Sequence, residues 1–313
     1  MPPAILGLHH VTATVDDAQP DLDFCIELLG LRLVKKTVNF DNHNVYHFYY
    51  GTELGAPGTI WTTFPYAGYS VRVGAKGAGQ VVTTAFSVPN GSLEFWRERL
   101  NKAGVASSDL EAHFGEPAIA FNDPSGLHCE LIATDRDTRQ PWTGVVESSF
   151  AVTGLHSVQM LVRYAQPSID FITRVLGYRV VGTSGNRTRV GVNGDAPGHL
   201  IDIIEDNDAK AAVNGLGTVH HVAMAITTAA EQLQLRDELA TLNVGVTDVR
   251  DRTYFTSIYF REPGGVLFEV ATMKPGFDVD EEAAVLGRGL KLPPWEEQHR
   301  ASIEKNLAPV TYR

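Results

Sequence analysis

The 313-residue sequence has only two cysteines, Cys25 and Cys129, which exclude a disulfide framework and supply no cysteine-based zinc motif. Basic residues are in the minority, with 26 Lys and Arg against 37 Asp and Glu. The resulting net charge of −11 argues against a broad surface for nucleic acid or for an anionic membrane. No apolar run reaches the ~18 residues that a membrane-spanning helix needs. We therefore expect a cytoplasmic protein without nucleic-acid or membrane partners.

The sequence has instead an ordinary globular composition, 43% hydrophobic and 20% charged, and a phrase that recurs four times. Each phrase contains an opening strand of alternating polarity, an amphipathic helix, and further strands, the last of which follows a turn. The opening strands are expected at residues 8–15, 82–88, 155–162 and 220–226, and the helices near 19–29, 92–103, 166–176 and 229–242. Each module thus has the order βαβββ, and the fold class is α+β.

The four modules divide the chain into two halves and a tail. Residues 1–140 hold modules one and two, residues 150–275 hold modules three and four, and residues 276–313 form a C-terminal tail with a helix near 296–307. The tail lies outside the repeats, so we expect it to cover a sheet edge or a pocket mouth, or to contact a second subunit in a homo-oligomer.

Comparison of equivalent positions in the repeats separates two pairs of modules. The opening strands of modules one and four each contain a His-His pair. At the position of its second histidine, the four modules have His10, Thr83, Ser157 and His221 in order. Six residues after the proline that precedes each closing strand stand Thr63, Glu130, Ile203 (or Asp202 after a one-residue slip) and Glu269. Modules one and four together therefore hold two histidines and a carboxylate. Modules two and three hold a set too poor in ligands for a transition metal.

Side-chain direction also selects one histidine from each His-His pair. Because successive strand residues point to opposite faces, the apolar face of Val11 leaves His10 on the other side, toward a cavity. The same parity turns His221 and Glu269 inward, and it turns His9 and His220 away. Two histidines and one carboxylate form a metal site that leaves coordination positions open for a substrate and O2.

The ligand pattern, together with four segments, resembles the vicinal oxygen chelate superfamily, which includes glyoxalase I, fosfomycin-resistance transferases and extradiol dioxygenases. These segments, residues 31–40, 46–51, 57–59 and 137–141, are similar to the hydroquinone-type ring-cleaving dioxygenases, a group with 2,6-dichlorohydroquinone dioxygenases and MhqO-type dioxygenases. The resemblance implies two open barrels: modules one and four around the metal, and modules two and three metal-free. It also implies Fe(II), with Mn(II) as the alternative, and ring cleavage of a hydroquinone-type aromatic diol with O2.

The resemblance also suggests roles near the metal. Arg252 and Tyr259 match groups that stabilise an anion or handle protons, and His9 and His220 match a pair close to the site, either as supports for the ligands or as acid–base groups. Three other functions stay open: a Mn(II)-dependent transferase of the fosfomycin-resistance kind, a glyoxalase-like lyase, and a non-enzymatic binder of small molecules. Thr63 at the position of a fourth ligand argues against glyoxalase I, and four fused modules argue against the transferases, which are normally single pairs that dimerise.

Overall fold

The computed structural model describes residues 5–312, apart from the side chain of Ala112, and its elements confirm four βαβββ modules. Module one contains β1 (Ile5–Val15), α1 (Ala18–Leu22), a π-helix (Asp23–Leu28), β2 (Arg32–Asn39), β3 (Asn42–Gly51) and β4 (Ile60–Pro65). Module two contains β5 (Gln80–Val88), α2 (Leu93–Lys102), β6 (Ser107–His113), β7 (Glu116–Asn122) and β8 (His128–Ala133).

The second half repeats this order and ends in the tail. Module three contains β9 (Gly154–Val162), α3 (Ala165–Val175), β10 (Arg179–Ser184), β11 (Arg187–Gly191) and β12 (Leu200–Glu205). Module four contains β13 (Thr218–Ile226), α4 (Ala229–Thr241), β14 (Arg250–Asp251), β15 (Thr256–Arg261) and β16 (Leu267–Thr272). The tail holds three short 3₁₀ turns, Phe277–Val279, Ala283–Val285 and Glu297–His299, and the helix α5 (Arg300–Asn306).

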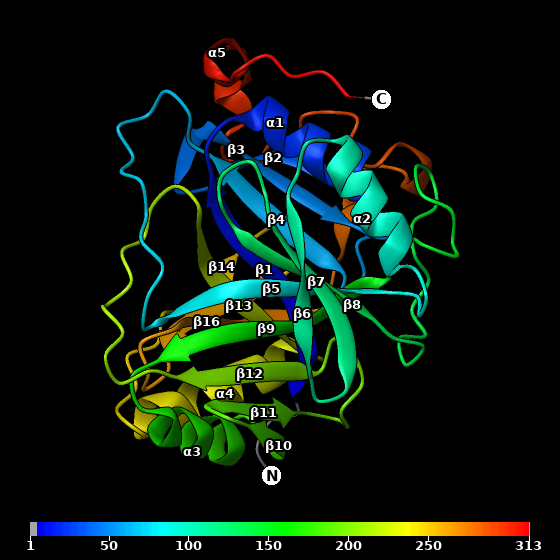
Figure 1. Ribbon diagram of the computed structural model, residues 1–313. Helices are drawn as coiled ribbons and strands as arrows, with labels where there is room; N and C mark the ends of the chain where they lie inside the picture. The colour runs from blue at the N-terminus through cyan, green and yellow to red at the C-terminus, as the bar shows by residue number, and fades with distance from the viewer. Residues whose placement is uncertain (1–4, 313) are drawn as a thin grey trace.

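The strands form two curved eight-stranded sheets, each built from two modules (Figure 1). The first has the order β14-β15-β16-β13-β1-β4-β3-β2, and the second has the order β10-β11-β12-β9-β5-β8-β7-β6. Modules one and four therefore share one half-barrel and modules two and three share the other, as predicted. In the first sheet the opening strands β1 and β13 pair antiparallel at the centre, and each pairs in parallel with its own closing strand. This arrangement brings His10 of β1 and His221 of β13, which are 211 positions apart in the sequence, into neighbouring strands.

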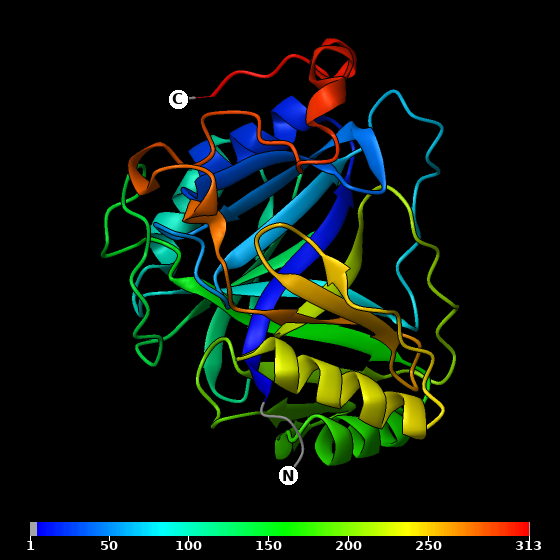
Figure 2. The same cartoon turned by 180° about the vertical axis from the view of Figure 1, so that it is seen from behind.

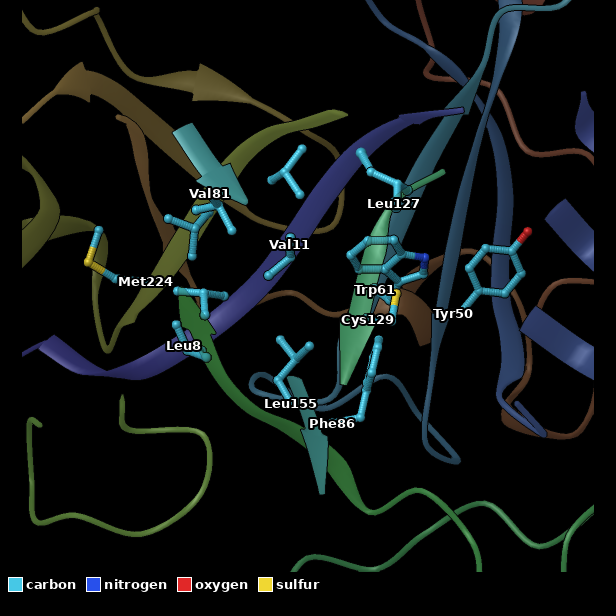
Figure 3. Close-up of a cluster of buried hydrophobic side chains, with 14 of the residues drawn as sticks. Leu8, Val11, Tyr50, Trp61, Val81, Phe86, Leu127, Cys129, Leu155 and Met224 are labelled. Atoms are coloured by element: carbon cyan, nitrogen blue, oxygen red, sulfur yellow. The ribbon is translucent and has the colours of Figure 1, made fainter. Parts of the chain in front are cut away.

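The hydrophobic core lies where the two sheets meet. Val11 and Trp61 of the first sheet gather with Val81, Phe86 and Leu155 of the second in one buried cluster (Figure 3). Helical residues such as those of α2 and α3 join the same cluster, so the apolar face of β1 packs against the second sheet as well as against helices. The opposite face of β1, which carries His10, stays free to face the inside of the half-barrel.

Three of the helices mark the two ends of the molecule. In both views α3 and α4 lie side by side at one end, whereas α5 lies at the other (Figures 1 and 2). The tail covers an edge of the first sheet, because Leu290 forms a β-bridge with Lys36 of the edge strand β2. Among residues 5–312, no helix is long and apolar enough to cross a membrane.

Candidate metal centre

Three side chains from three neighbouring strands converge inside the first half-barrel. His10 comes from β1, His221 from β13 and Glu269 from β16, and all three are buried. The strand register explains the convergence, since His221 lies opposite Thr12 of β1 and Glu269 lies beside Ala223 of β13. Among the described residues, this is the group of His, Cys, Asp and Glu side chains whose geometry could hold a metal ion.

The donor atoms of these residues form a small triangle. Nε2 of His10 lies 3.2 Å from Nε2 of His221 and 3.3 Å from Oε2 of Glu269, and the third side is 2.8 Å. Bonds of ~2.1 Å from one cation to ligand atoms at right angles would set those atoms ~3 Å apart. The buried Oε2 of Glu269 forms no hydrogen bond with any described residue. The three residues therefore fit a divalent cation on one side of the triangle.

Each histidine ligand is held by the histidine that precedes it. The Nδ1 atoms of His9 and His10 lie 2.9 Å apart, and those of His220 and His221 lie 2.7 Å apart. Burial, and next the neighbouring His10, lowers the pKa of His9 to about 3, so His9 is neutral and its Nδ1 can accept the His10 proton. This hydrogen bond fixes the tautomer that leaves the Nε2 lone pair of His10 for a metal.

Strand parity predicts the position of His220 incorrectly. We expected His9 and His220 to point away from the cavity, yet His220 lines it; His9 does not line it, and its ring centroid lies 4.9 Å from that of Phe255. The reason is a pair of β-bulges in the β1–β13 ladder. Leu8 and His10 pair with adjacent residues of β13, which leaves His9 as an extra residue on β1. At a second bulge, Thr12 and Ala13 pair with His221 and Val219, which leaves His220 as an extra residue on β13. A bulge redirects side chains relative to the regular alternation.

The carboxylate of Glu269 is oriented from its other side by Ser257. The Ser257 hydroxyl of β15 donates a hydrogen bond to Oε1, while Oε2 faces the two imidazoles. Burial would raise the pKa of Glu269, but His10 and His221 outweigh it and hold this pKa well below its usual range. The residue is therefore an ionised carboxylate, as a metal ligand has to be. Ser257 had no predicted role, although it lies two residues before Tyr259 and thus on the same strand face, a signal that the sequence did contain.

A cavity of about 220 Å³ opens beside the triangle. Its walls include aromatic and polar side chains, with the three ligand residues on one side. Arg252 and Tyr259 line it together: Nε of Arg252 donates to the Tyr259 hydroxyl at 3.0 Å, and Tyr259 lies opposite Glu269 in the β15–β16 ladder. Burial and then the Glu269 charge raise the pKa of Tyr259, so its hydroxyl keeps its proton.

The chain is similar to known proteins over nearly its whole length. Residues 154–270 match the model of the Glyoxalase/Bleomycin resistance protein/Dioxygenase superfamily. A Bacillus subtilis protein named as a ring-cleaving dioxygenase, MhqO, is 41% identical over 309 residues, which cover 98% of this chain and 97% of that protein. The chain belongs to this superfamily.

A second relative and a solved structure also match over nearly the full length. The chlorohydroquinone/hydroquinone 1,2-dioxygenase of Sphingobium indicum is 36% identical, with 94% of this chain and 93% of that protein covered. A crystal structure of a Bacillus subtilis protein described as a dioxygenase has a TM-score of 0.94 and 41% identity, with 99% of both chains covered.

The second half-barrel has the same strand arrangement but lacks two of the three candidate ligands. Its register places Ser157 at the position of His10, Thr83 at that of His221 and Glu130 at that of Glu269. Glu130 accepts a hydrogen bond from Gln159 at 2.7 Å. In the same half-barrel Arg189 lies 2.7 Å from Asp202 and 2.5 Å from Glu116, so ion pairs fill its interior.

The register also corrects two of the closing-strand equivalences. Counting six residues from the proline gave Thr63 in module one and Ile203 in module three. The ladders instead place Thr62 beside Thr12 and Asp202 beside Gln159, the positions that match Glu269 beside Ala223. In these two modules the turn before the closing strand is one residue shorter, so the slip to Asp202 is right. The position of a possible fourth ligand is therefore Thr62, whose Oγ1 contacts Nε2 of His47 at 3.0 Å.

Proposed function

We propose that this chain is an Fe(II)-dependent dioxygenase that opens the ring of a hydroquinone-type aromatic diol with O2. The observation that carries the proposal is the His10–His221–Glu269 triangle, which faces a cavity rather than closed protein. A 2-His-1-carboxylate set with open positions is typical of non-haem Fe(II) oxygenases. The names of the two relatives, a ring-cleaving dioxygenase and a hydroquinone dioxygenase, support the same reaction class.

The size and lining of the cavity suit one aromatic ring. Its volume of about 220 Å³ compares with the ~150 Å³ of an apolar cavity that binds benzene. Phe64, Phe255 and Tyr49 supply ring faces and edges, while Arg252, Tyr259 and His220 supply polar groups for oxygen atoms. The position of the fourth ligand in glyoxalase I is held by Thr62, which supports the dioxygenase over a glyoxalase-like lyase.

In the proposed reaction the ring supplies the four electrons that reduce O2. A carbon–carbon bond beside a ring hydroxyl breaks, and both oxygen atoms enter a ring-opened semialdehyde acid or acyl product. Bound Fe(II), with Mn(II) as the alternative, would supply the redox chemistry and lower the pKa of a ring hydroxyl.

The residues of this chain would bind the diol and move protons. Because Arg252 donates to the Tyr259 oxygen, the Tyr259 proton is free to point at a substrate oxygen. His220 faces the cavity and can pass a proton, whereas His9 has only 2% of its surface exposed. We therefore assign His220 to proton transfer and His9 to the orientation of His10.

The test is O2 uptake by protein loaded anaerobically with Fe(II), given methylhydroquinone in one cell and catechol in another. We expect uptake with methylhydroquinone, and we expect His221→Ala to lose both uptake and bound iron. His128→Ala is a matched control, because His128 is exposed on β8 of the second sheet. Uptake with catechol alone would contradict the hydroquinone assignment. Bound iron without uptake would favour the transferase, and no bound metal in the parent chain would overturn the site.

A further inference from the structure

Tyr49 is the repeat equivalent of Tyr259, and both line the metal cavity. In module four Tyr259 of β15 lies opposite Glu269 of the closing strand. In module one Tyr49 of β3 lies opposite Thr62, which occupies the same closing-strand position as Glu269. The pseudo-symmetry of the half-barrel thus places one tyrosine on each side of the cavity.

The two hydroxyl groups differ in their partners. The Tyr259 hydroxyl accepts a hydrogen bond from Arg252 at 3.0 Å, but no residue between 5 and 312 forms a hydrogen bond with the Tyr49 hydroxyl. Only 2% of the Tyr49 surface is exposed, and the cavity is the space that its side chain reaches. The Tyr49 hydroxyl is not one of the fully enclosed polar atoms that lack a partner, so it opens onto the cavity, where the oxygen of a bound molecule can accept its hydrogen bond.

Aromatic packing holds the Tyr49 ring in place. Its centroid lies 4.0 Å from that of His47 and 5.0 Å from that of Phe277, and Tyr254 and Phe255 belong to the same buried cluster. The ring therefore has no room to turn its hydroxyl toward solvent. Burial raises the pKa of Tyr49, and although Arg252 opposes this, the hydroxyl remains a hydrogen-bond donor at neutral pH.

We propose that Tyr49 positions the aromatic diol by donating a hydrogen bond to the ring hydroxyl that is remote from the metal. Tyr259 lies opposite the candidate ligand Glu269, whereas Tyr49 lies opposite Thr62, which offers no carboxylate or imidazole to a metal. A diol bound through one oxygen on the Glu269 side would therefore present its other hydroxyl to Tyr49. The cavity would thus distinguish a diol from a simple phenol. This inference rests on the proposed function, because it requires an aromatic diol in the cavity.

The test compares hydroquinone with phenol, which lacks the second hydroxyl. Binding of each is measured by calorimetry under anaerobic conditions to the metal-loaded full chain, so that no turnover occurs. We expect Tyr49→Phe to weaken hydroquinone about 3- to 10-fold, the worth of one hydrogen bond, and to leave phenol binding unchanged. Tyr254→Phe is the control, because its hydroxyl bonds Asp280 at 3.1 Å in the same aromatic cluster, and it should change neither affinity.

The outcomes separate this inference from the proposed function. Equal weakening of both ligands, or no weakening of hydroquinone, would reject the role of Tyr49 while the parent chain still binds hydroquinone and takes up O2. A parent chain that binds hydroquinone no more tightly than phenol would reject the inference that the cavity recognises the second ring hydroxyl. A metal-loaded parent chain that binds neither ligand would reject the proposed function, and the role of Tyr49 with it.

Discussion

At the scale of single residues, Asp21 couples folding to pH. Its carboxylate is buried on α1, where it accepts hydrogen bonds from the Tyr50 hydroxyl at 2.7 Å and from the Thr63 hydroxyl at 2.6 Å. No cation pairs with it among the described residues, and burial raises the pKa of Asp21 from 3.8 to about 7. The folded state therefore binds a proton more tightly than the unfolded state does, and stability falls as pH rises through this interval.

Asp21→Asn is expected to remove this pH dependence. The difference in unfolding free energy between the parent chain and the variant should fall by about 3 kcal/mol between pH 4 and pH 7, and level off above about pH 8. Urea unfolding at a series of pH values measures it. Asp23→Asn, at an exposed carboxylate one residue beyond α1, should leave the parent curve unchanged. Parallel curves for the parent chain and the Asp21 variant would contradict the prediction.

The ligand residues could be predicted one by one because repeats can be compared within a single chain. Two of the four modules keep the histidine and two keep the glutamate, and only modules one and four together hold His10, His221 and Glu269, a contrast visible without any relative. Ser257 and Tyr49 could not be found in this way, because their importance depends on which residue faces them across a ladder. That register follows from the lengths of turns and from bulges, which the alternation of polarity does not reveal.

At the scale of elements, most strands and helices could be predicted, whereas irregularities could not. The expected helix near residues 19–29 is α1 followed by a π-helix, Asp23–Leu28, and the apolar pattern did not predict this change to i→i+5 hydrogen bonds. The expected tail helix near 296–307 shortens to α5, preceded by a 3₁₀ turn. The His9 and His220 bulges are the same kind of local insertion, and they lie beside the metal site.

The docking of the tail gives a prediction about one element. Lys35 of β2 is fully buried, and its Nζ lies 2.5 Å from both Asp280 and Glu281 of the tail. Lys35→Met leaves these carboxylates without their cation, so we expect a loss of about 3–5 kcal/mol in the free energy of unfolding. Denaturant unfolding at pH 7 measures the loss, and limited proteolysis should show earlier cleavage in the tail.

A neighbouring lysine supplies the control for this element. Lys36 lies over the Tyr312 ring at 5.0 Å and forms no ion pair with a described residue. Lys36→Met should cost about 1 kcal/mol or less. Equal losses for the two variants would mean that the buried ion pairs do not hold the tail.

At the scale of the whole molecule, each half-barrel is shared between the two halves of the sequence. Repeat comparison indicated that modules one and four hold complementary ligands, and this complementarity, together with the family resemblance, predicted their pairing. In the second half-barrel, Arg189 and Asp202 form an ion pair inside the barrel, where the first half-barrel has its candidate ligands. The sequence alone could not show this pair, because it depends on which residues lie opposite each other in neighbouring strands. The fold thus uses one architecture twice, with different interiors.

The shared half-barrel predicts that neither half of the chain binds the metal alone. Residues 1–140 carry His10, and residues 141–313 carry His221 and Glu269, so the site requires the antiparallel pairing of β1 with β13. Expressed separately, neither fragment should retain Fe(II) or Mn(II) through gel filtration. Co-expressed fragments that associate should recover about one metal per pair, and His10→Ala in the first fragment should abolish that recovery. Retention of metal by residues 141–313 alone, with the affinity of the intact chain, would mean that His10 is not a ligand and that the site lies within one half.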